Sequence, residues 1–262
     1  MALIQTTISQ LRIDSGLNPA DEYYTTDIGQ EGFWYVDGTC TPADDNTGTI
    51  LYNTSGGNQK VNRVYDKGFV NVKWFGAKGD NSTDDIIPIQ NAIDAITKTK
   101  YADIWNSATT SPNHDFGGGT VFFPAGIYVI TKNILVGQHC KLLGVSKGGY
   151  EYPIDDNNQT GSVIKCNFTN ENDNEQQWAI QTACYWTNKA GNPNISKQGD
   201  LISEDYYVSP SDFDNKFVTL AFGVIIEGLI INGEFEINAV KQHHYGGIKL
   251  SGSPNSLIRN VE

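Results

Sequence analysis

Three glutamates near the end of the 262-residue chain could take part in acid–base chemistry: Glu227, Glu234 and Glu236. If Glu234 and Glu236 lie on one strand, their side chains face the same side, about 6.6 Å apart from the strand rise. Two carboxyl groups at such a spacing are compatible with hydrolysis of a glycosidic bond by the inverting route. A solvated polar corner after Gly233 explains the same pair more simply. We treat Glu234 and Glu236 as catalytic candidates beside that simpler interpretation.

Aromatic side chains are concentrated between residues 178 and 217, where they could bind a sugar. They are Trp178, Tyr185, Trp186, Tyr206, Tyr207, Phe213 and Phe217. Sugar rings have apolar faces and hydroxyl edges, so aromatic rings beside many Asn, Gln and Asp side chains offer stacking surface and hydrogen bonds. The candidate carbohydrate-binding residues are Trp178, Trp186, Tyr206 and Tyr207. Some of these rings could instead hold a loop in place or pack against another subunit.

An acidic stretch with hydroxyl groups, Asp80 to Asp85, could suggest a calcium site or a catalytic site. The start of a helix explains it more simply, because carboxylates and hydroxyls there accept hydrogen bonds from free backbone N–H groups and complement the helix dipole. Pro88 must then lie in the first turn, which favours Asp84 or Asp85 as the N-cap over Thr83.

The composition argues against several partners and cofactors. The formal net charge is −12, and there is no cluster of Lys and Arg that could bind a nucleic acid or an anionic membrane. No segment is long and apolar enough to span a bilayer, and the N-terminus lacks the pattern of a signal peptide. The four cysteines show no C-x-x-C spacing and no pairing with histidine. We expect no nucleic acid, no membrane insertion, no metal and no cofactor.

One amphipathic helix is predicted over about residues 84–98. Its apolar stripe consists of Ile86, Ile89, Ala92, Ile93 and Ile96. Before the helix, Val70, Val72 and Trp74 indicate a short strand, which a turn with two glycines follows. After the helix comes a polar linker, residues 97–116, read as a surface loop. Residues 117–130 then contain two β-rich runs on either side of a Pro–Ala–Gly turn. The helix must therefore cover a β structure.

Together these segments resemble the opening of the pectate-lyase-like right-handed parallel β-helix family, of the phage tailspike and tail-fibre type. In that family a strand, a G-A-x-G-D-G-x-T-D-D turn and a helix close one end of the solenoid. The matching residues are Gly76, Ala77, Gly79, Asp80, Thr83, Asp84, Asp85, Gln90, Ala92, Gly118, Gly119, Val121, Phe123, Pro124, Gly126 and Tyr128. Asn81 replaces the second glycine of the turn and also tolerates a left-handed backbone. The resemblance implies an all-β fold, a right-handed parallel β-helix (solenoid) with an N-terminal capping helix.

Residues 1–69 precede this resemblance and are expected to form a small β-rich module. Short β-rich runs punctuated by Gly, Asp and Asn favour an antiparallel sheet, and Leu3 to Ile13 fits a strand or a short helix. Such a module before a β-helix resembles the particle-proximal heads of phage tailspikes. We therefore expect a head or attachment module at 1–69 and the N-terminal part of the β-helix at 70–262, with coils from about 118.

The second half of the chain has the spacing of stacked coils. The runs beginning at Gly223 and Gly247 are 24 residues apart, and those beginning at Leu229 and Leu257 are 28 apart. A period in the twenties, with Asn and Gly at the corners, is typical of a β-solenoid. No polar cap follows the last motif, so we expect either a longer protein or closure by another subunit.

The resemblance implies a phage virion tailspike or tail-fibre protein that attaches to the particle through its N-terminal part and engages polysaccharide on the host surface. It also implies a homotrimer, contacts with phage tail or baseplate proteins, a place in the virion tail and assembly in the host cytoplasm. The resemblance leaves open whether the protein also depolymerises the polysaccharide, and catalytic residues for that reaction are expected beyond Glu262. The alternative is a secreted bacterial polysaccharide lyase or glycoside hydrolase of the same family. A third hypothesis is a solenoid that serves only as a rigid shaft.

Overall fold

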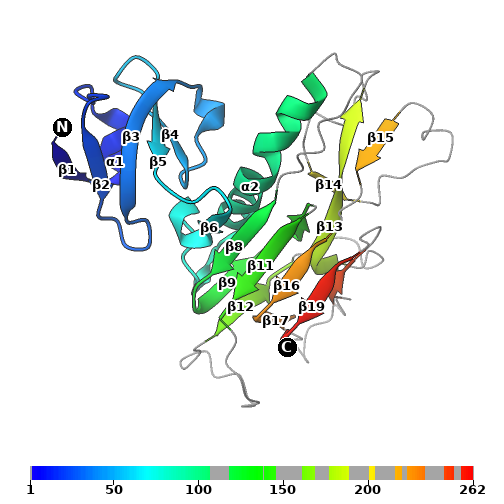
Figure 1. Cartoon of the computed structure of the whole chain (residues 1–262). Helices are drawn as coiled ribbons and strands as arrows, with labels where there is room; N and C mark the ends of the chain where they lie inside the picture. Colours follow the sequence, from blue (N-terminus) through cyan, green and yellow to red (C-terminus); the bar gives the residue numbers. More distant parts are fainter. Residues whose placement is uncertain are drawn as a thin grey trace.

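The computed structural model describes residues 2–106, 118–137, 139–145, 161–168, 177–188, 201–203, 216–219, 223–233, 245–250 and 255–261. Of these, residues 97–106, 177, 183–188, 201–203, 216–219 and 245–246 are described by their backbone alone. Two bodies with separate hydrophobic cores follow each other along the chain (Figure 1). We call residues 2–64 the N-terminal module and the part from Phe69 onward the β-helix.

The N-terminal module is a five-stranded sheet with one short helix. The sheet order is β1 (Leu3–Thr6), β2 (Glu22–Thr25), β3 (Gly32–Thr39), β5 (Gln59–Arg63) and β4 (Ile50–Tyr52). The pair β1–β2 is parallel and the other neighbours are antiparallel. The segment from Leu3 to Ile13 contains both a strand and a helix, since α1 (Ile8–Ile13) starts at the capping box formed by Thr7 and Gln10. A 3₁₀ turn, η1 (Pro42–Asp44), precedes β4.

Three parallel sheets make up the β-helix. Sheet 1 contains β6 (Phe69–Asn71), β8 (Gly119–Phe123), β11 (Cys140–Gly144), β16 (Ile225–Glu227) and β19 (Leu257–Arg259). Sheet 2 contains β7 (Asp80–Asp84), β9 (Gly126–Ile130), β12 (Ser162–Cys166) and β17 (Leu229–Asn232). Sheet 3 contains β10 (Ile134–Val136), β13 (Gln177–Asn188) and β18 (Tyr245–Lys249). The chain visits sheets 1, 2 and 3 in turn and then returns to sheet 1, always in parallel, which confirms the predicted right-handed parallel β-helix.

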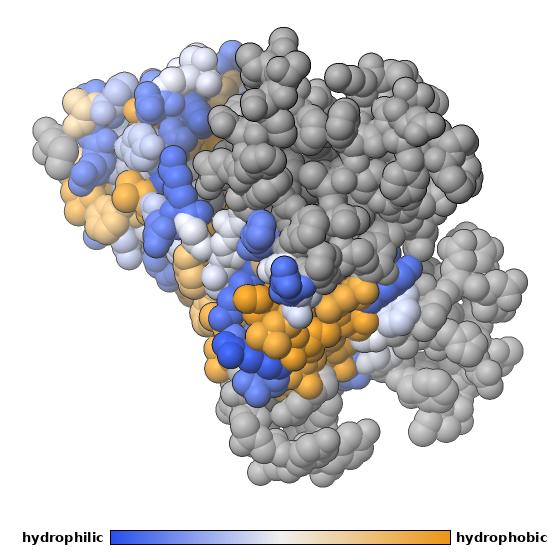
Figure 2. Space-filling model, turned by 45° about the vertical axis from the view of Figure 1, so that its right-hand side comes forward, coloured by the Kyte–Doolittle hydropathy of each residue, from blue (hydrophilic) through white to orange (hydrophobic). Residues whose placement is uncertain are grey.

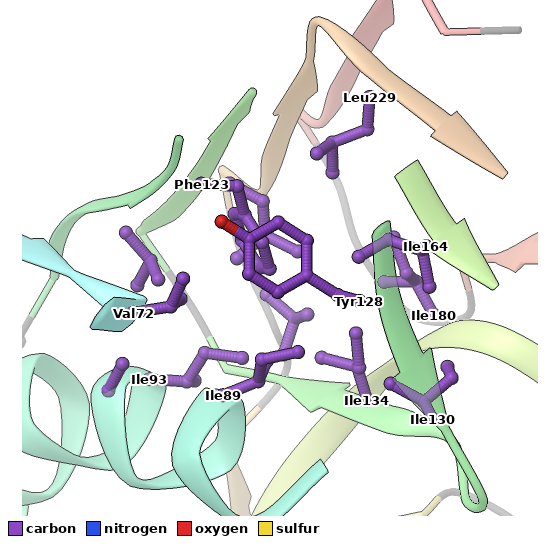
Figure 3. Packing of buried hydrophobic residues seen from close by; sticks show 14 of the residues in the cluster. Val72, Ile89, Ile93, Phe123, Tyr128, Ile130, Ile134, Ile164, Ile180 and Leu229 are labelled. Atoms are coloured by element: carbon purple, nitrogen blue, oxygen red, sulfur yellow. The ribbon is translucent and has the colours of Figure 1, made fainter. Parts of the chain in front are cut away.

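Inward-pointing side chains form stacks from one coil to the next. In sheet 1 the register aligns Val70, Val121, Leu142, Ile226 and Ile258. In sheet 3 it aligns Ile134, Ile180 and Ile248. Tyr128 of β9 fills the centre of this core, among side chains from all three sheets and the capping helix (Figure 3). Each buried aliphatic side chain stabilises the fold by roughly 1.5–3 kcal/mol relative to an exposed one.

The capping helix α2 (Ile86–Asn106) covers one end of this core. All five residues of the predicted stripe are buried, whereas Ile87, on the opposite side of the helix, is 69% exposed. The helix begins close to the predicted start but continues past the predicted end near residue 98. The part of the predicted surface loop from 97 to 106 contains no Gly or Pro that would stop a helix.

Two local predictions before this helix were wrong. Asp80 to Asp84 form β7, a strand whose register shifts between Asp80 and Asp84, and not the first turn of the helix. The side chain of Asp80 accepts hydrogen bonds from Thr83 N at 2.8 Å and Ser82 N at 3.0 Å, so it bends the chain within the strand. The predicted strand through Trp74 stops at Asn71, because the Asn71 side chain caps a 3₁₀ turn, η2 (Val72–Phe75).

The predicted coil period was also wrong in its pairing. Gly223 precedes a strand of sheet 1, whereas Gly247 lies on a strand of sheet 3, and Ile225 pairs with Leu257 in the next coil. Leu229 pairs with Ser162 in sheet 2. The short β runs of the three sheets have similar sequences, so sequence comparison matched strands of different sheets. After β13 the structure describes two further strands, β14 (Leu201–Ser203) and β15 (Lys216–Thr219), which pair antiparallel with β13.

Candidate functional site: the outer face of sheet 1

Four of the six site residues predicted from the sequence lie outside the described residues, and the other two lie on β13. Trp178 lies on β13, half-buried and opposite Gly246 of β18. Trp186 lies further along β13, where its backbone pairs with Val218 of β15. The remaining candidates, Glu234, Glu236, Tyr206 and Tyr207, lie outside the described residues. All six roles therefore stay predictions.

The outer face of sheet 1 is the described surface that brings aromatic, apolar and charged side chains together. Since Val121, Leu142 and Ile226 point into the core, their neighbours on each strand point outward. The outward apolar residues are Phe69, Phe122, Leu143, Ile225 and Leu257, and the outward polar residues are Asn71, Thr120, Lys141, Glu227 and Arg259. Figure 2 shows a continuous apolar area on the β-helix with hydrophilic residues beside it.

Aromatic rings occupy the end of this face next to the N-terminal module. The rings of Phe69 and Phe122 lie 5.9 Å apart, centroid to centroid, on neighbouring strands. Phe69 meets Trp74 edge to face at 6.3 Å, and Trp74 meets Tyr65 at 6.2 Å. All four rings keep part of their surface exposed. A row of partly exposed rings is the kind of surface on which sugar rings stack.

Charged side chains cross the other end of the face. The two partners of Glu227 come from the neighbouring coils: Lys141 Nζ lies 2.8 Å from Oε2, and Arg259 Nε lies 2.8 Å from Oε1. Arg259 Nη2 also donates to Oε2 at 2.9 Å. Because the register sets Leu143 beside Glu227 and Glu227 beside Arg259, this ladder joins three successive coils. We call Lys141, Glu227 and Arg259 the charge ladder.

The electrostatics of the ladder limit what Glu227 can do. Hydrogen bonds from Arg259 first and from Lys141 second lower the pKa of Glu227. The hydrogen bond to Glu227 raises the pKa of Arg259 in turn. Glu227 is therefore ionised at neutral pH and has no proton to give as a general acid. Lys141 and Arg259 have more N–H groups than the ladder uses, so they can bind hydroxyl or carboxylate groups of a ligand.

The acidic stretch beside the capping helix is occupied by structural contacts. The carboxylate of Asp85 is buried and accepts from Lys78 N at 2.6 Å and Gly79 N at 2.8 Å. Asp84 accepts from Ile86 N at 3.2 Å, which is the helix-start contact expected from the sequence, and from Thr131 Oγ1 at 2.6 Å. Within the described part of the chain, no three His, Cys, Asp or Glu side chains are grouped so as to hold a metal ion. No helix of that same part is long and apolar enough to cross a bilayer.

Sequence reasoning considered Glu227 and missed its two partners. Lys141 and Arg259 are separated from it by intervals of very different length, because the chain between successive strands of sheet 1 varies. A signal was present in the alternation on two of the strands, since Lys141 and Glu227 each adjoin a buried aliphatic residue and so take an outward position.

Comparison with known proteins identifies relatives for part of the chain. The family model described as rhamnogalacturonase A/epimerase, pectate lyase-like, matches residues 69–199. A probable glucan endo-1,3-beta-glucosidase from Arthroderma benhamiae is 31% identical over 131 residues, which cover 50% of this chain and 12% of that protein. The mannuronan C5-epimerase AlgE3 from Azotobacter vinelandii is 38% identical over 82 residues, which cover 31% of this chain and 4% of that protein. This chain therefore corresponds to a small part of either relative's length.

Among solved structures, the enzymatically active domain of tailspike protein 2 from bacteriophage CBA120 is similar to this chain. The TM-score is 0.49 at 11% sequence identity, and the match covers 95% of this chain and 26% of that one.

Proposed function

Because this chain belongs to the pectate-lyase-like family of rhamnogalacturonase A and epimerases, we propose that its β-helix binds a polysaccharide along the outer face of sheet 1. The curated relatives are named for enzymes that act on a 1,3-β-glucan and on mannuronan, one neutral polysaccharide and one acidic. Both polymers are chains of sugar rings that carry hydroxyl groups, so either could contact several strands of a sheet face at once.

The observation that carries this proposal is the combination of an aromatic row and a charge ladder on one face. Five strands at about 4.8 Å spacing give this face a length of about 19 Å along the solenoid. Phe69 and Phe122 offer stacking surface at one end. Lys141 and Arg259 offer hydrogen-bond donors at the other end. An acidic polysaccharide would gain more from these two cations than a neutral one.

A binding measurement with two polymers tests this assignment. We expect the full chain to bind 1,3-β-glucan or mannuronan, and Phe122→Ala to weaken binding about tenfold, equal to about 1.4 kcal/mol. Phe33→Ala is the matched control, because Phe33 is an exposed aromatic residue on the N-terminal module. Trp178→Ala tests the aromatic candidates of sheet 3 in the same assay. Binding that Trp178→Ala abolishes and Phe122→Ala leaves unchanged would move the site to sheet 3, and absence of binding to both polymers would contradict the proposal.

The wider proposal is a tailspike or tail-fibre protein of a phage virion, homotrimeric and attached through its N-terminal module. The support is the organisation of the chain, in which a module with its own core precedes the β-helix. The alternative is a secreted bacterial polysaccharide lyase or glycoside hydrolase, which the name of the glucosidase relative favours. The molar mass in solution separates the two: a trimer supports the spike, and a monomer supports the secreted enzyme.

A further inference from the structure

A buried arginine lies where the N-terminal module meets the β-helix. Arg63, the last residue of β5, is 4% exposed. Its guanidinium carbon lies 4.4 Å from the ring centroid of Trp34, which belongs to the core of the module, and 4.9 Å from that of Trp74 in η2. One planar cation is thus stacked between a ring of each body. Such cation–π contacts strengthen when the cation is removed from water.

The guanidinium donates three hydrogen bonds to backbone carbonyl groups of the N-terminal module. Nε donates to the carbonyl oxygen of Gly48 at 2.5 Å, Nη1 to that of Glu31 at 2.8 Å and Nη2 to that of Gln30 at 2.9 Å. Burial lowers the pKa of Arg63 to about 10, so the group is still protonated at neutral pH. A buried charge costs free energy unless it is compensated, and here three carbonyls and two ring faces compensate it. The contact with the β-helix through Trp74 is therefore part of what keeps Arg63 buried.

Two more contacts tie η2 to the module. Gln30 Nε2 donates to the carbonyl oxygen of Trp74 at 2.9 Å. Phe75 belongs to the core of the β-helix, yet its ring packs against Gly48 so closely that a Cβ on Gly48 would lie 2.5 Å from it. The side chains of Trp74 and Phe75 thus contact both bodies at once. Figure 1 shows the module next to the end of the β-helix where β6 and α2 lie.

We propose that the N-terminal module is the outer layer of the β-helix cap and that Arg63 holds it in place. The module and the first coil then unfold as one cooperative unit. The end of a solenoid must be covered, because its terminal coil otherwise exposes core side chains and an open strand edge. The helix α2 covers the aliphatic stack, and the module covers the aromatic pair Trp74 and Phe75. The module therefore stabilises the β-helix as well as any partner-binding role it has. This inference does not depend on polysaccharide binding.

Hydrogen exchange on the full chain, read peptide by peptide together with thermal unfolding, tests the coupling. The first variant is Arg63→Lys, which keeps the positive charge. It loses the planar guanidinium group that stacks on the two tryptophan rings and donates several hydrogen bonds at once. The second is Gly48→Ala, which keeps the arginine itself and forces Phe75 to move. Gly68→Ala is the control, because a Cβ there meets only Asp66 Oδ1 at an ordinary 3.6 Å.

We expect both variants to speed exchange about tenfold or more in peptides from η2 and the start of α2, as well as in peptides from the module. The melting temperature should fall by about 4 °C or more in a single transition, whereas Gly68→Ala melts like the parent chain. A variant that unfolds throughout, β-helix included, also agrees with one cooperative unit. Faster exchange confined to residues 2–64, with η2 and α2 unchanged, would overturn the proposal, and so would two separate melting transitions.

Discussion

Gln90 of α2 holds the backbone of Leu135 with both ends of its side-chain amide. Nε2 donates to the carbonyl oxygen of Leu135 at 3.1 Å, and Oε1 accepts from its N–H at 3.1 Å. Leu135 lies on β10, the strand at the edge of sheet 3 nearest the cap. The amide group therefore imitates the next strand and satisfies an edge that would otherwise be open to another chain.

Replacing this glutamine should loosen the edge of sheet 3. Gln90→Leu leaves a donor and an acceptor of Leu135 without a partner, so we expect the free energy of unfolding to fall by about 1–3 kcal/mol. Urea unfolding measures the loss, and faster amide exchange of β10 locates it. Gln5→Leu, at an exposed position of β1, should change little. Equal stability of the two variants would mean that water replaces Gln90 at no cost.

The apolar stripe of α2 allows a comparison within one helix. Ile93→Ala removes a fully buried side chain from the core and should cost about 2–5 kcal/mol. Ile87→Ala, on the exposed side, should stay within about 0.5 kcal/mol of the parent chain. Chemical unfolding of the two variants checks the difference. If the two variants lost similar amounts of unfolding free energy, the side of the helix that carries Ile87 would also have to pack against the core.

Asp85 links the capping helix to the turn before it, and its replacement should depend on pH. Asp85→Asn keeps one acceptor of two, which leaves Lys78 N or Gly79 N unpaired at a cost of about 1–3 kcal/mol. Burial, as the largest cause, raises the pKa of Asp85. A carboxyl group whose pKa is raised in the folded state contributes stability at low pH that is lost as the pH rises through the folded pKa. As the pH falls from 7 towards the ordinary pKa of an aspartate, the difference in unfolding free energy should therefore move in favour of the parent chain; movement the other way would contradict a raised pKa.

The charge ladder should respond to pH in the opposite direction. The pKa of Glu227 is lowered, so its contribution is present above the ordinary pKa of a glutamate and is lost as the pH falls through the folded value. Glu227→Gln should lower the melting temperature at pH 7, and this effect should shrink as the pH falls below the ordinary pKa of a glutamate. Because the ladder lies on the surface, salt should reduce the difference at pH 7. A difference that survives acid and salt alike would point to packing instead of charge.

The capping end of the fold could be predicted from the sequence because its signals are local. Five apolar residues of α2 repeat at helical intervals, and all five are buried. Asn81 was expected to tolerate a left-handed backbone and has φ of 64°. The same locality explains the errors nearby. The segment that begins at Asp80 has the composition of a helix start, but its pairing with Ile127 of β9 makes it a strand.

The candidate site could not be predicted in the same way, because it depends on register. Ile225 pairs with Lys141 on one side and with Leu257 on the other, across stretches of chain that differ greatly in length. No fixed period relates the three members of the charge ladder, so only the folded coils place them together. The aromatic row is similar: Phe69 and Phe122 belong to different coils, and the helix α2 lies between them in the sequence.

The unequal intervals between coils have a consequence for how such a protein can change. Aligned stacks such as Val121, Leu142 and Ile226 fix the axis of the solenoid, whatever length of chain connects them. Exchange or enlargement of the segments between the strands would change the side surfaces of the molecule. The direction of the solenoid axis would stay the same. Related proteins could therefore differ in the segments between strands while the stacked coils of the β-helix stay the same.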